Sequence, residues 1–386
     1  MALPRRLCML TVPVLPALQY PLARPLVRRR CSTAVGLSSR PAGPEPSGPA
    51  WDPAHPALYF YNDVYEFPLP EGHRFPMEKY RLVRRKLQHT LVPGGLAAFD
   101  VSPLASREDL VTTHCPAYVD RFLTGELTPG ENRCIGFPWS EAGVDRAVSS
   151  TGGTVAAARA VLEDGGPRFA GQVAGGTHHA FYDYGEGFCV FSDIAVAANC
   201  ALREHAAWLR RVLVVDLDVH QGNGNAVLFA DDPAVFTYSA QCEQNLFSKR
   251  EASDVDVWVP SGAGDDAYLG MLRETLPAVF ERVRPQLVFF QAGVDGLDAD
   301  RLGRLGLSRE GLRQRNDLVY DLVLGGKDTR LVVTLGGGYP KDLSTSSRPF
   351  HDIVDAHADV YVQASQRLAR SSMAAARRED SSTRMP

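Results

Sequence analysis

VLVVDLDVHQGNG, residues 212–224, joins an apolar run to a cluster of carboxylate, imidazole and amide side chains. A short run that is apolar throughout is typical of a strand buried on both faces of a parallel sheet. Two further runs have this character, LVFF at 287–290 and LVVTL at 331–335. Stretches with a helical pattern precede or separate the three runs, at 153–163, 194–205 and 266–283. The alternation predicts an α/β fold, a doubly wound three-layer α/β/α sandwich with a mostly parallel sheet.

Polar residues follow each of these predicted strands. Asp216, Asp218 and His220 come after the first strand, Asp295 after the second, and the turn GGGY at 336–339 after the third. Ligands bind beyond the carboxyl ends of the strands in such folds. We therefore expect these groups to meet at one rim of the sheet.

The spacing of Asp216, Asp218 and His220 places their side chains on one face of an extended chain. Carboxylates held this close repel one another unless a cation neutralises them. Three protein ligands, Asp218, His220 and Asp295, with one position left open form the arrangement of a catalytic zinc. The alternative is a solvated turn with incidental acidic residues.

A second cluster is GGTHHA at 175–180, in which two adjacent histidines lie in a glycine-flanked loop. Beside a metal-bound water, His178 and His179 are suited to take up a proton and later deliver one to a leaving amine. The alternative is that the pair binds metal or packs within the loop.

Five motifs follow one another along the chain: GTHHA (176–180), GFCVFSD (187–193), DLDVHQGNG (216–224), AGVDGLDADRLG (292–303) and GGGY (336–339). Together, from about Tyr59 to about Asp342, they resemble the histone deacetylase superfamily. HRFPMEKY at 73–80, with Gln221 and Asn223, looks most like the class IV branch and its bacterial-type relatives. The resemblance implies the arginase/deacetylase fold, with a central eight-stranded parallel sheet and helices on both sides.

The resemblance also implies a role for each polar motif residue. It implies one Zn²⁺ per chain, with three ligands: Asp218, His220 and Asp295. It implies a catalytic set in which His179 is general base and acid, His178 is its electrostatic partner bonded to Asp216, Asn223 lies behind His179, and Tyr339 polarises the substrate carbonyl. It implies a substrate channel lined by Gly187, Phe188 and Gly337. It allows for a structural K⁺ held by Asp216, Asp218 and Ser239.

Two positions depart from the pattern of this family. Many relatives have an aspartate where this chain has Asn223, and a neutral amide stabilises an imidazolium less than a carboxylate does. We therefore expect His179 to be less basic than with an aspartate partner. The loop from Gln241 to Arg250 has no clear match to the channel aromatics of the family, and its Phe247, a candidate for the channel, is assigned to the core instead.

The resulting functional prediction is zinc-dependent hydrolysis of N-acyl-lysine amides in proteins or peptides. The main alternative is deacetylation of a small acylated amine such as a polyamine, which would use the same catalytic residues. A two-metal ureohydrolase needs further acidic or histidine ligands where this chain has Gln221 and Asn223. A catalytically silent acyl-lysine-binding scaffold is disfavoured by the intact set of metal, histidine and tyrosine residues.

Composition sets further bounds on the protein. The net charge of −4 over 386 residues does not indicate nucleic-acid binding. No run approaches the roughly 18 apolar residues of a membrane span. The seven cysteines form no C-x-x-C pair, and their odd number and wide spacing argue against a disulfide framework, so we expect a reducing compartment and mostly buried thiols.

The N-terminus is rich in arginine and has no acidic residue before Glu45. This pattern is typical of organelle transit peptides, for a mitochondrion or a plastid. A secretory signal and an unstructured tail of a nuclear or cytoplasmic protein are the alternatives. We expect residues 1–50 to be a disordered targeting segment and linker, 55–368 the catalytic domain, and 369–386 a disordered tail.

Overall fold

A computed structural model describes residues 57–245, 247–326 and 328–383 of the chain. The predicted targeting segment, 1–50, lies outside this range. The described residues form eight strands: β1 (Ala57–Tyr61), β2 (Ala98–Val101), β3 (Phe169–Gln172), β4 (Val212–Asp216), β5 (Val235–Cys242), β6 (Val255–Val259), β7 (Leu287–Gln291) and β8 (Arg330–Thr334). They pair in the order β2-β1-β3-β8-β7-β4-β5-β6, and every pairing is parallel.

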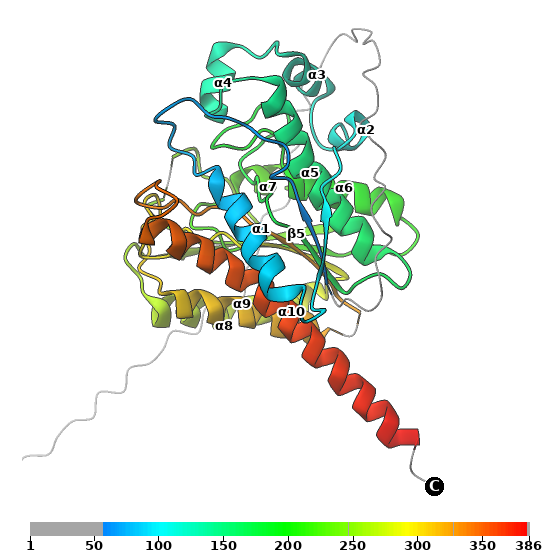
Figure 1. Ribbon diagram of the computed structural model, residues 1–386. Coiled ribbons are helices and arrows are strands. Elements are labelled where there is room, and N and C mark those ends of the chain that lie inside the picture. Colours follow the sequence, from blue (N-terminus) through cyan, green and yellow to red (C-terminus); the bar gives the residue numbers. More distant parts are fainter. Residues whose placement is uncertain (1–56, 246, 327, 384–386) are drawn as a thin grey trace, which may run out of the picture. The chain divides into compact units, whose positions relative to one another are not determined.

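The helices lie on both sides of this sheet (Figure 1). Their bounds are α1 (Glu78–Leu91), α2 (Arg107–Leu110), α3 (Pro116–Thr124), α4 (Pro129–Ile135), α5 (Glu141–Leu162), α6 (Asp193–Glu204), α7 (Asn223–Leu228), α8 (Asp265–Val283), α9 (Arg309–Gly325) and α10 (Arg348–Thr383). Helices α1, α8, α9 and α10 pack on one face, and α5 and α6 pack on the other.

Strand β7 shows why the apolar runs have no polar alternation. Leu287 and Phe289 point into the core under α5 and α6, while Val288 and Phe290 point into the core under the other four helices. Successive side chains of a strand face opposite sides, so a strand between two helical layers needs apolar residues at every position. The predicted three-layer sandwich and its eight-stranded parallel sheet are confirmed.

The register of the strands brings the predicted site residues to one edge. Asp216 at the end of β4 is level with Gln291 of β7 and Ser239 of β5, and Gln291 is level with Thr334 of β8. The loops that leave these strands carry the aspartates, the histidine and the GGGY turn. Their convergence thus follows from parallel pairing in register.

Helix α5 begins earlier than its sequence pattern indicates. The predicted stretch started at residue 153, but the helix begins at Glu141 behind a Ser140 cap. A Cβ on Gly152 would lie 2.0 Å from the carbonyl oxygen of Pro103. The glycine therefore permits close approach of another chain segment inside the helix.

At the C-terminus, α10 continues to Thr383 and passes Leu368, where we placed the end of the catalytic domain. The stretch MAAARR at 373–378 consists of strong helix formers, which explains the continuation. Of the five described cysteines, Cys134 is exposed and the other four are buried, as expected. Among the described helices, none is both long and apolar enough to cross a membrane.

Candidate metal site and catalytic centre

The side chains of Asp218, His220 and Asp295 converge beyond the ends of β4 and β7. Nδ1 of His220 lies 3.1 Å from Oδ1 of Asp218 and 3.1 Å from Oδ2 of Asp295. One ligand atom of each residue lies within 4.8 Å of the others. Zinc binds nitrogen and oxygen at about 2.0–2.1 Å in tetrahedral geometry, which separates two ligand atoms by about 3.3 Å. The spacing of the three side chains therefore fits a zinc ion.

Backbone groups hold the two carboxylates in place. Asp218 accepts hydrogen bonds from the amides of His220 (3.0 Å) and Gly337 (2.8 Å), and Asp295 accepts one from the amide of Val219 (2.9 Å). A Cβ on Gly337 would lie 2.2 Å from Oδ2 of Asp295. Gly337 was predicted to line the channel; it borders the inner cavity and also packs directly against the predicted metal ligands.

The electrostatics of this cluster favour a cation. Burial by itself would lower the pKa of His220, but its hydrogen bonds to Asp218 and Asp295 outweigh burial and raise the pKa to about 10. The two buried carboxylates thus stabilise a positive charge between them. A divalent metal ion held by Asp218, His220 and Asp295 would supply that charge in place of the proton of His220.

The two adjacent histidines lie next to the cluster and have different partners. Nδ1 of His178 lies 2.6 Å from Oδ2 of Asp216, and the rings of His178 and His179 have centroids 3.9 Å apart. Burial opposes protonation of His178, but the charges of Asp216 and Asp218 raise its pKa to about 9. Burial and the charges of His178 and His220 lower the pKa of His179 well below its usual value. This separation suits one charged partner and one neutral base.

Asn223 orients the second histidine, and it does not act alone. Its side-chain oxygen lies 2.7 Å from Nδ1 of His179 and also accepts the amide of Gly224 at 3.0 Å. Its side-chain nitrogen donates to Oε1 of Glu186 at 2.9 Å. The amide of Gly224 and the carboxylate of Glu186 fix the orientation of the Asn223 side chain, so its oxygen faces His179. Nδ1 of His179 must then carry the hydrogen of this bond. The other ring nitrogen, Nε2, then carries no hydrogen and can accept a proton.

Tyr339 lies at the same cavity as His179 and His220. Its backbone amide donates to Asp300 at 2.5 Å, and its carbonyl accepts the amide of Arg301 at 2.8 Å, which fixes the residue after the glycine turn. Burial and the nearby carboxylates raise the pKa of its phenol well above the usual value. Tyr339 therefore remains a neutral hydrogen-bond donor.

Aromatic rings form the walls above the predicted metal ligands. The ring of Phe188 lies 5.0 Å from that of Phe75 and 6.2 Å from that of Tyr339. Phe188 has a φ of 67°, in the left-handed region that a phenylalanine rarely adopts, and it follows Gly187 with a φ of 58°. Backbone strain of this kind is concentrated at functional sites. The predicted channel wall, Gly187 and Phe188, borders both the inner cavity, which Asp218 and Gly337 also line, and the mouth of that cavity, which Phe247 also lines.

Phe247 was assigned to the core, and this assignment is wrong. The residue is 53% exposed, and its ring stands edge-on to His179, with centroids 4.6 Å apart. A Cβ on Gly187 would lie 2.7 Å from the Phe247 ring, so that glycine leaves room for it. Phe247 thus lines the mouth together with Phe188. The loop around it has no periodic pattern from which its position could be read.

Lys79 is a second residue that the sequence analysis missed. It is 1% exposed, and its ammonium group donates to the carbonyls of Gly336 (3.3 Å) and Gly338 (3.1 Å). It also lies 5.4 Å from the ring centre of Tyr339. Lys79 therefore supports the turn that carries Tyr339. The motif HRFPMEKY contains it, but a lysine in a first helical turn is usually solvated.

Ser239 lies beside Asp216 on the neighbouring strand. Its hydroxyl accepts the amide of Gly222 at 3.4 Å. These contacts give no indication of an ion. The structural K⁺ at Asp216, Asp218 and Ser239 stays a prediction.

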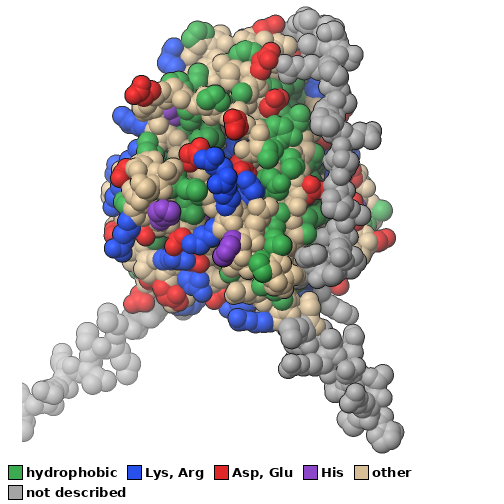
Figure 2. Space-filling model, in the orientation of Figure 1, with side chains coloured by type: hydrophobic (Ala, Val, Ile, Leu, Met, Phe, Trp, Pro, Cys, Tyr) green, Lys and Arg blue, Asp and Glu red, His purple; other side chains and the backbone are tan. Residues whose placement is uncertain are grey.

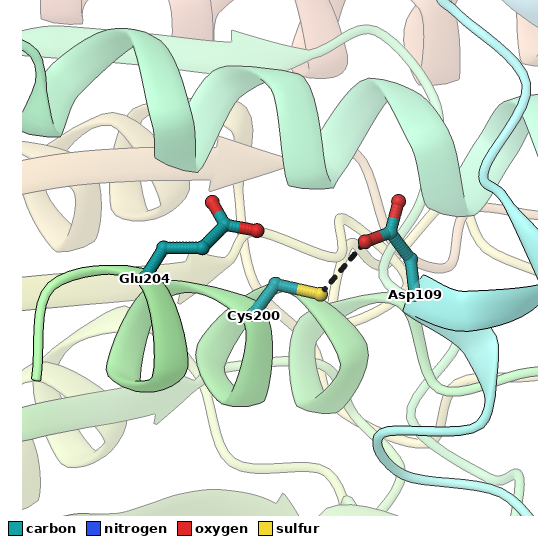
Figure 3. A group of neighbouring side chains, drawn as sticks. All are labelled: Asp109, Cys200 and Glu204. Carbon is teal, nitrogen blue, oxygen red and sulfur yellow. Dashed lines mark hydrogen bonds between the residues drawn. The ribbon is translucent and has the colours of Figure 1, made fainter.

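A separate acidic cluster, Asp109, Cys200 and Glu204, lies where α2 meets α6 (Figure 3). Its carboxylates already have cationic partners, because Arg159 donates to Asp109 at 2.9 Å and to Glu204 at 2.7 Å. Burial and Asp109 raise the pKa of Cys200 to about 12, so the thiol keeps its proton and donates to Asp109. Metals bind the thiolate form. We assign this cluster to an ion-pair network that joins the two helices.

Comparisons with known proteins agree with this geometry. Residues 73–351 match the histone deacetylase domain. An uncharacterized protein of Picosynechococcus is 42% identical over 300 residues, which cover 77% of this chain and 95% of that protein. A histone deacetylase-like amidohydrolase of Pseudomonas aeruginosa is 32% identical over 271 residues, 66% of this chain and 70% of that protein.

Histone deacetylase 2 of Arabidopsis thaliana is 36% identical over 211 residues, 53% of this chain and 51% of that protein. These relatives support a deacetylase or amidohydrolase activity. The closer link to class IV stays a prediction. By its matching domain and its relatives, the chain belongs to the histone deacetylase family.

Proposed function

We propose that the protein is a zinc-dependent hydrolase of N-acyl-lysine amides. The observation that carries the proposal is the convergence on one cavity of the metal ligands Asp218 and His220, the base His179 and the donor Tyr339. Asp295 completes the ligand set. When bound, Zn²⁺ polarises the substrate carbonyl and lowers the pKa of a bound water.

His179 carries the proton transfers. Its Nδ1 hydrogen is engaged by Asn223, so Nε2 accepts a proton from the attacking water. The neutral state favoured by burial is the state that this step requires. His179 then delivers the proton to the departing amine, and the products are a carboxylate and a free lysine-type amine.

Two neighbouring groups support these steps. The phenol of Tyr339 donates to the oxygen on which negative charge develops, an interaction worth on the order of 3 kcal/mol. His178, held by Asp216, provides a positive charge beside His179. The aromatic rings of Phe188 and Phe247 pack along the methylene stem of the acyl-lysine.

The test is a panel of lysine peptides that carry acyl groups from acetyl to myristoyl, assayed with and without chelator. Hydrolysis that is lost with chelator and restored by Zn²⁺ supports the proposal. In Tyr339→Phe, kcat should fall by about two orders of magnitude while the zinc content stays at one per chain. Loss of zinc in this variant would show that the role of Tyr339 is misassigned.

A further inference from the structure

The mouth of the catalytic cavity has an unusual distribution of charge. It is bordered by the site residues His179, His220 and Tyr339, and also by the arginines Arg133 and Arg304. Among the described residues that line it, none is an aspartate or a glutamate. A substrate whose amide lies at the metal ligands must extend through this mouth to solvent.

The two arginines come from different parts of the chain. Arg133 is exposed in the last turn of α4, and Arg304 is exposed in the loop between β7 and α9. The side chain of Asn245 ties the loop around Arg304 in place, because it accepts the amide of Arg304 at 2.9 Å and donates to the carbonyl of Leu302 at 2.7 Å. The mouth is therefore built of segments joined by hydrogen bonds.

Neither Arg133 nor Arg304 forms an ion pair with a described residue, whereas some other arginines of the surface do. Arg107, for example, pairs with Asp120, and Arg309 pairs with Asp359. Lys249 beside the mouth is also paired, with Glu251 at 2.9 Å.

The positive charge of the mouth is a local feature. The chain as a whole has a net charge of −4, and acidic and basic side chains are intermingled on the face shown in Figure 2. The lining of the mouth, with two arginines and no aspartate or glutamate among its described residues, differs from this mixture. The two arginines are available to a ligand.

We propose that Arg133 and Arg304 select substrates with a carboxylate close to the acylated amine. This inference rests on the proposed function. An acyl-lysine whose stem occupies the aromatic channel places its own backbone and adjacent residues at the mouth. A carboxylate there meets guanidinium groups that bind it in a bidentate manner. The carboxylate belongs either to a flanking aspartate or glutamate or to free Nε-acyl-lysine.

The same charges act against the alternative substrate considered from the sequence. An acetylated polyamine brings one or more further ammonium groups to the mouth. These are repelled by two guanidinium groups and find no carboxylate there. The mouth thus favours an acyl-lysine in an acidic context over a polycationic amine.

The experiment compares kcat/KM of the zinc-loaded protein for peptides with the same acyl-lysine but flanked by Glu, Gln or Lys. Free Nε-acetyl-lysine and an acetylated polyamine complete the set and separate the two sources of carboxylate. Two exposed ion pairs predict a preference for Glu over Gln flanks between about 2-fold and 30-fold, decreasing as salt is added. A preference for Lys flanks or for the polyamine overturns the proposal.

The double variant Arg133→Gln/Arg304→Gln should abolish the preference for Glu flanks, and retention of the preference overturns the proposal. Arg85→Gln, on the exposed surface of α1 and outside the mouth, is the control and should keep it. Calorimetric binding of Nε-acetyl-lysine gives a readout without turnover. Weaker binding of Nε-acetyl-lysine to the double variant supports the proposed role of Arg133 and Arg304, even if the protein hydrolyses none of the substrates. Absence of hydrolysis would refute the proposed function and not the role of the two arginines.

Discussion

His114 connects the catalytic loop to the rest of the domain, and its titration should control stability in acid. Its side chain is fully buried. Nδ1 donates to the carbonyl of Phe181, two residues after His179, at 2.8 Å. Nε2 accepts the amide of Ser192, the cap of α6, at 3.0 Å. The neutral ring satisfies both partners, whereas a second proton on the ring would break the bond from Ser192.

The magnitude follows from the shift of its pKa. Burial lowers the pKa of His114 from 6.5 to about 4. Between these two pH values, His114 binds a proton in the unfolded chain but not in the folded chain. The stability that the neutral His114 contributes is therefore full above pH 6.5 and is lost as the pH falls from there toward 4. The contribution of His114 to the free energy of unfolding should decrease by about 2 kcal/mol between about pH 7.5 and pH 5, and by about 3 kcal/mol in total.

The assay is urea unfolding of the wild type and of His114→Gln at both pH values. Glutamine offers a donor and an acceptor but does not titrate. The variant is expected to start less stable, by about 1 kcal/mol, and to lose about 2 kcal/mol less than the wild type on acidification. His89→Gln, which removes an exposed imidazole on α1, is the control and should follow the wild type. Equal pH dependence in His114→Gln and the wild type would refute the reasoning.

Three further predictions concern the site. Asn223 donates to Glu186, so an aspartate at position 223 would be repelled by the Glu186 carboxylate. The variant to test is therefore Asn223→Asp combined with Glu186→Gln, which removes this repulsion. The new carboxylate should raise the pKa of His179 and move the acidic limb of the pH–rate profile up by about one unit or more; an unmoved limb contradicts the assigned role. Gly337→Ala places a methyl group against Asp295 and should weaken zinc binding by about tenfold or more in elemental analysis of dialysed protein, whereas Gly270→Ala, at an open position, should not. Phe247→Ala should raise KM by about two- to tenfold and leave the unfolding midpoint unchanged, because the ring is exposed. A lowered midpoint would show that Phe247 packs in the core after all.

The sequence predicted the fold and the centre of the site because both depend on local patterns. Apolar runs such as 287–290 indicate strands covered on both faces, and in a parallel sheet the carboxyl ends of such strands meet at one edge. The residues after these runs, among them Asp218 and Asp295, could therefore be assigned to one site. The prediction for α5 started too late, at residue 153, because the helix continues through Gly152, where another chain segment approaches closely.

Only the tertiary structure revealed the contacts that loops make. Glu186 lies behind Asn223, Phe247 stands at the mouth, and Lys79 supports the turn before Tyr339, although each is far along the chain from its partner. Loops have no repeat that fixes which way a side chain points, and their contacts depend on how distant segments pack. The sequence by itself thus determined the strands and the edge of the sheet at which these groups meet, whereas tertiary packing decided the order of the strands and the support, the walls and the charge of the site.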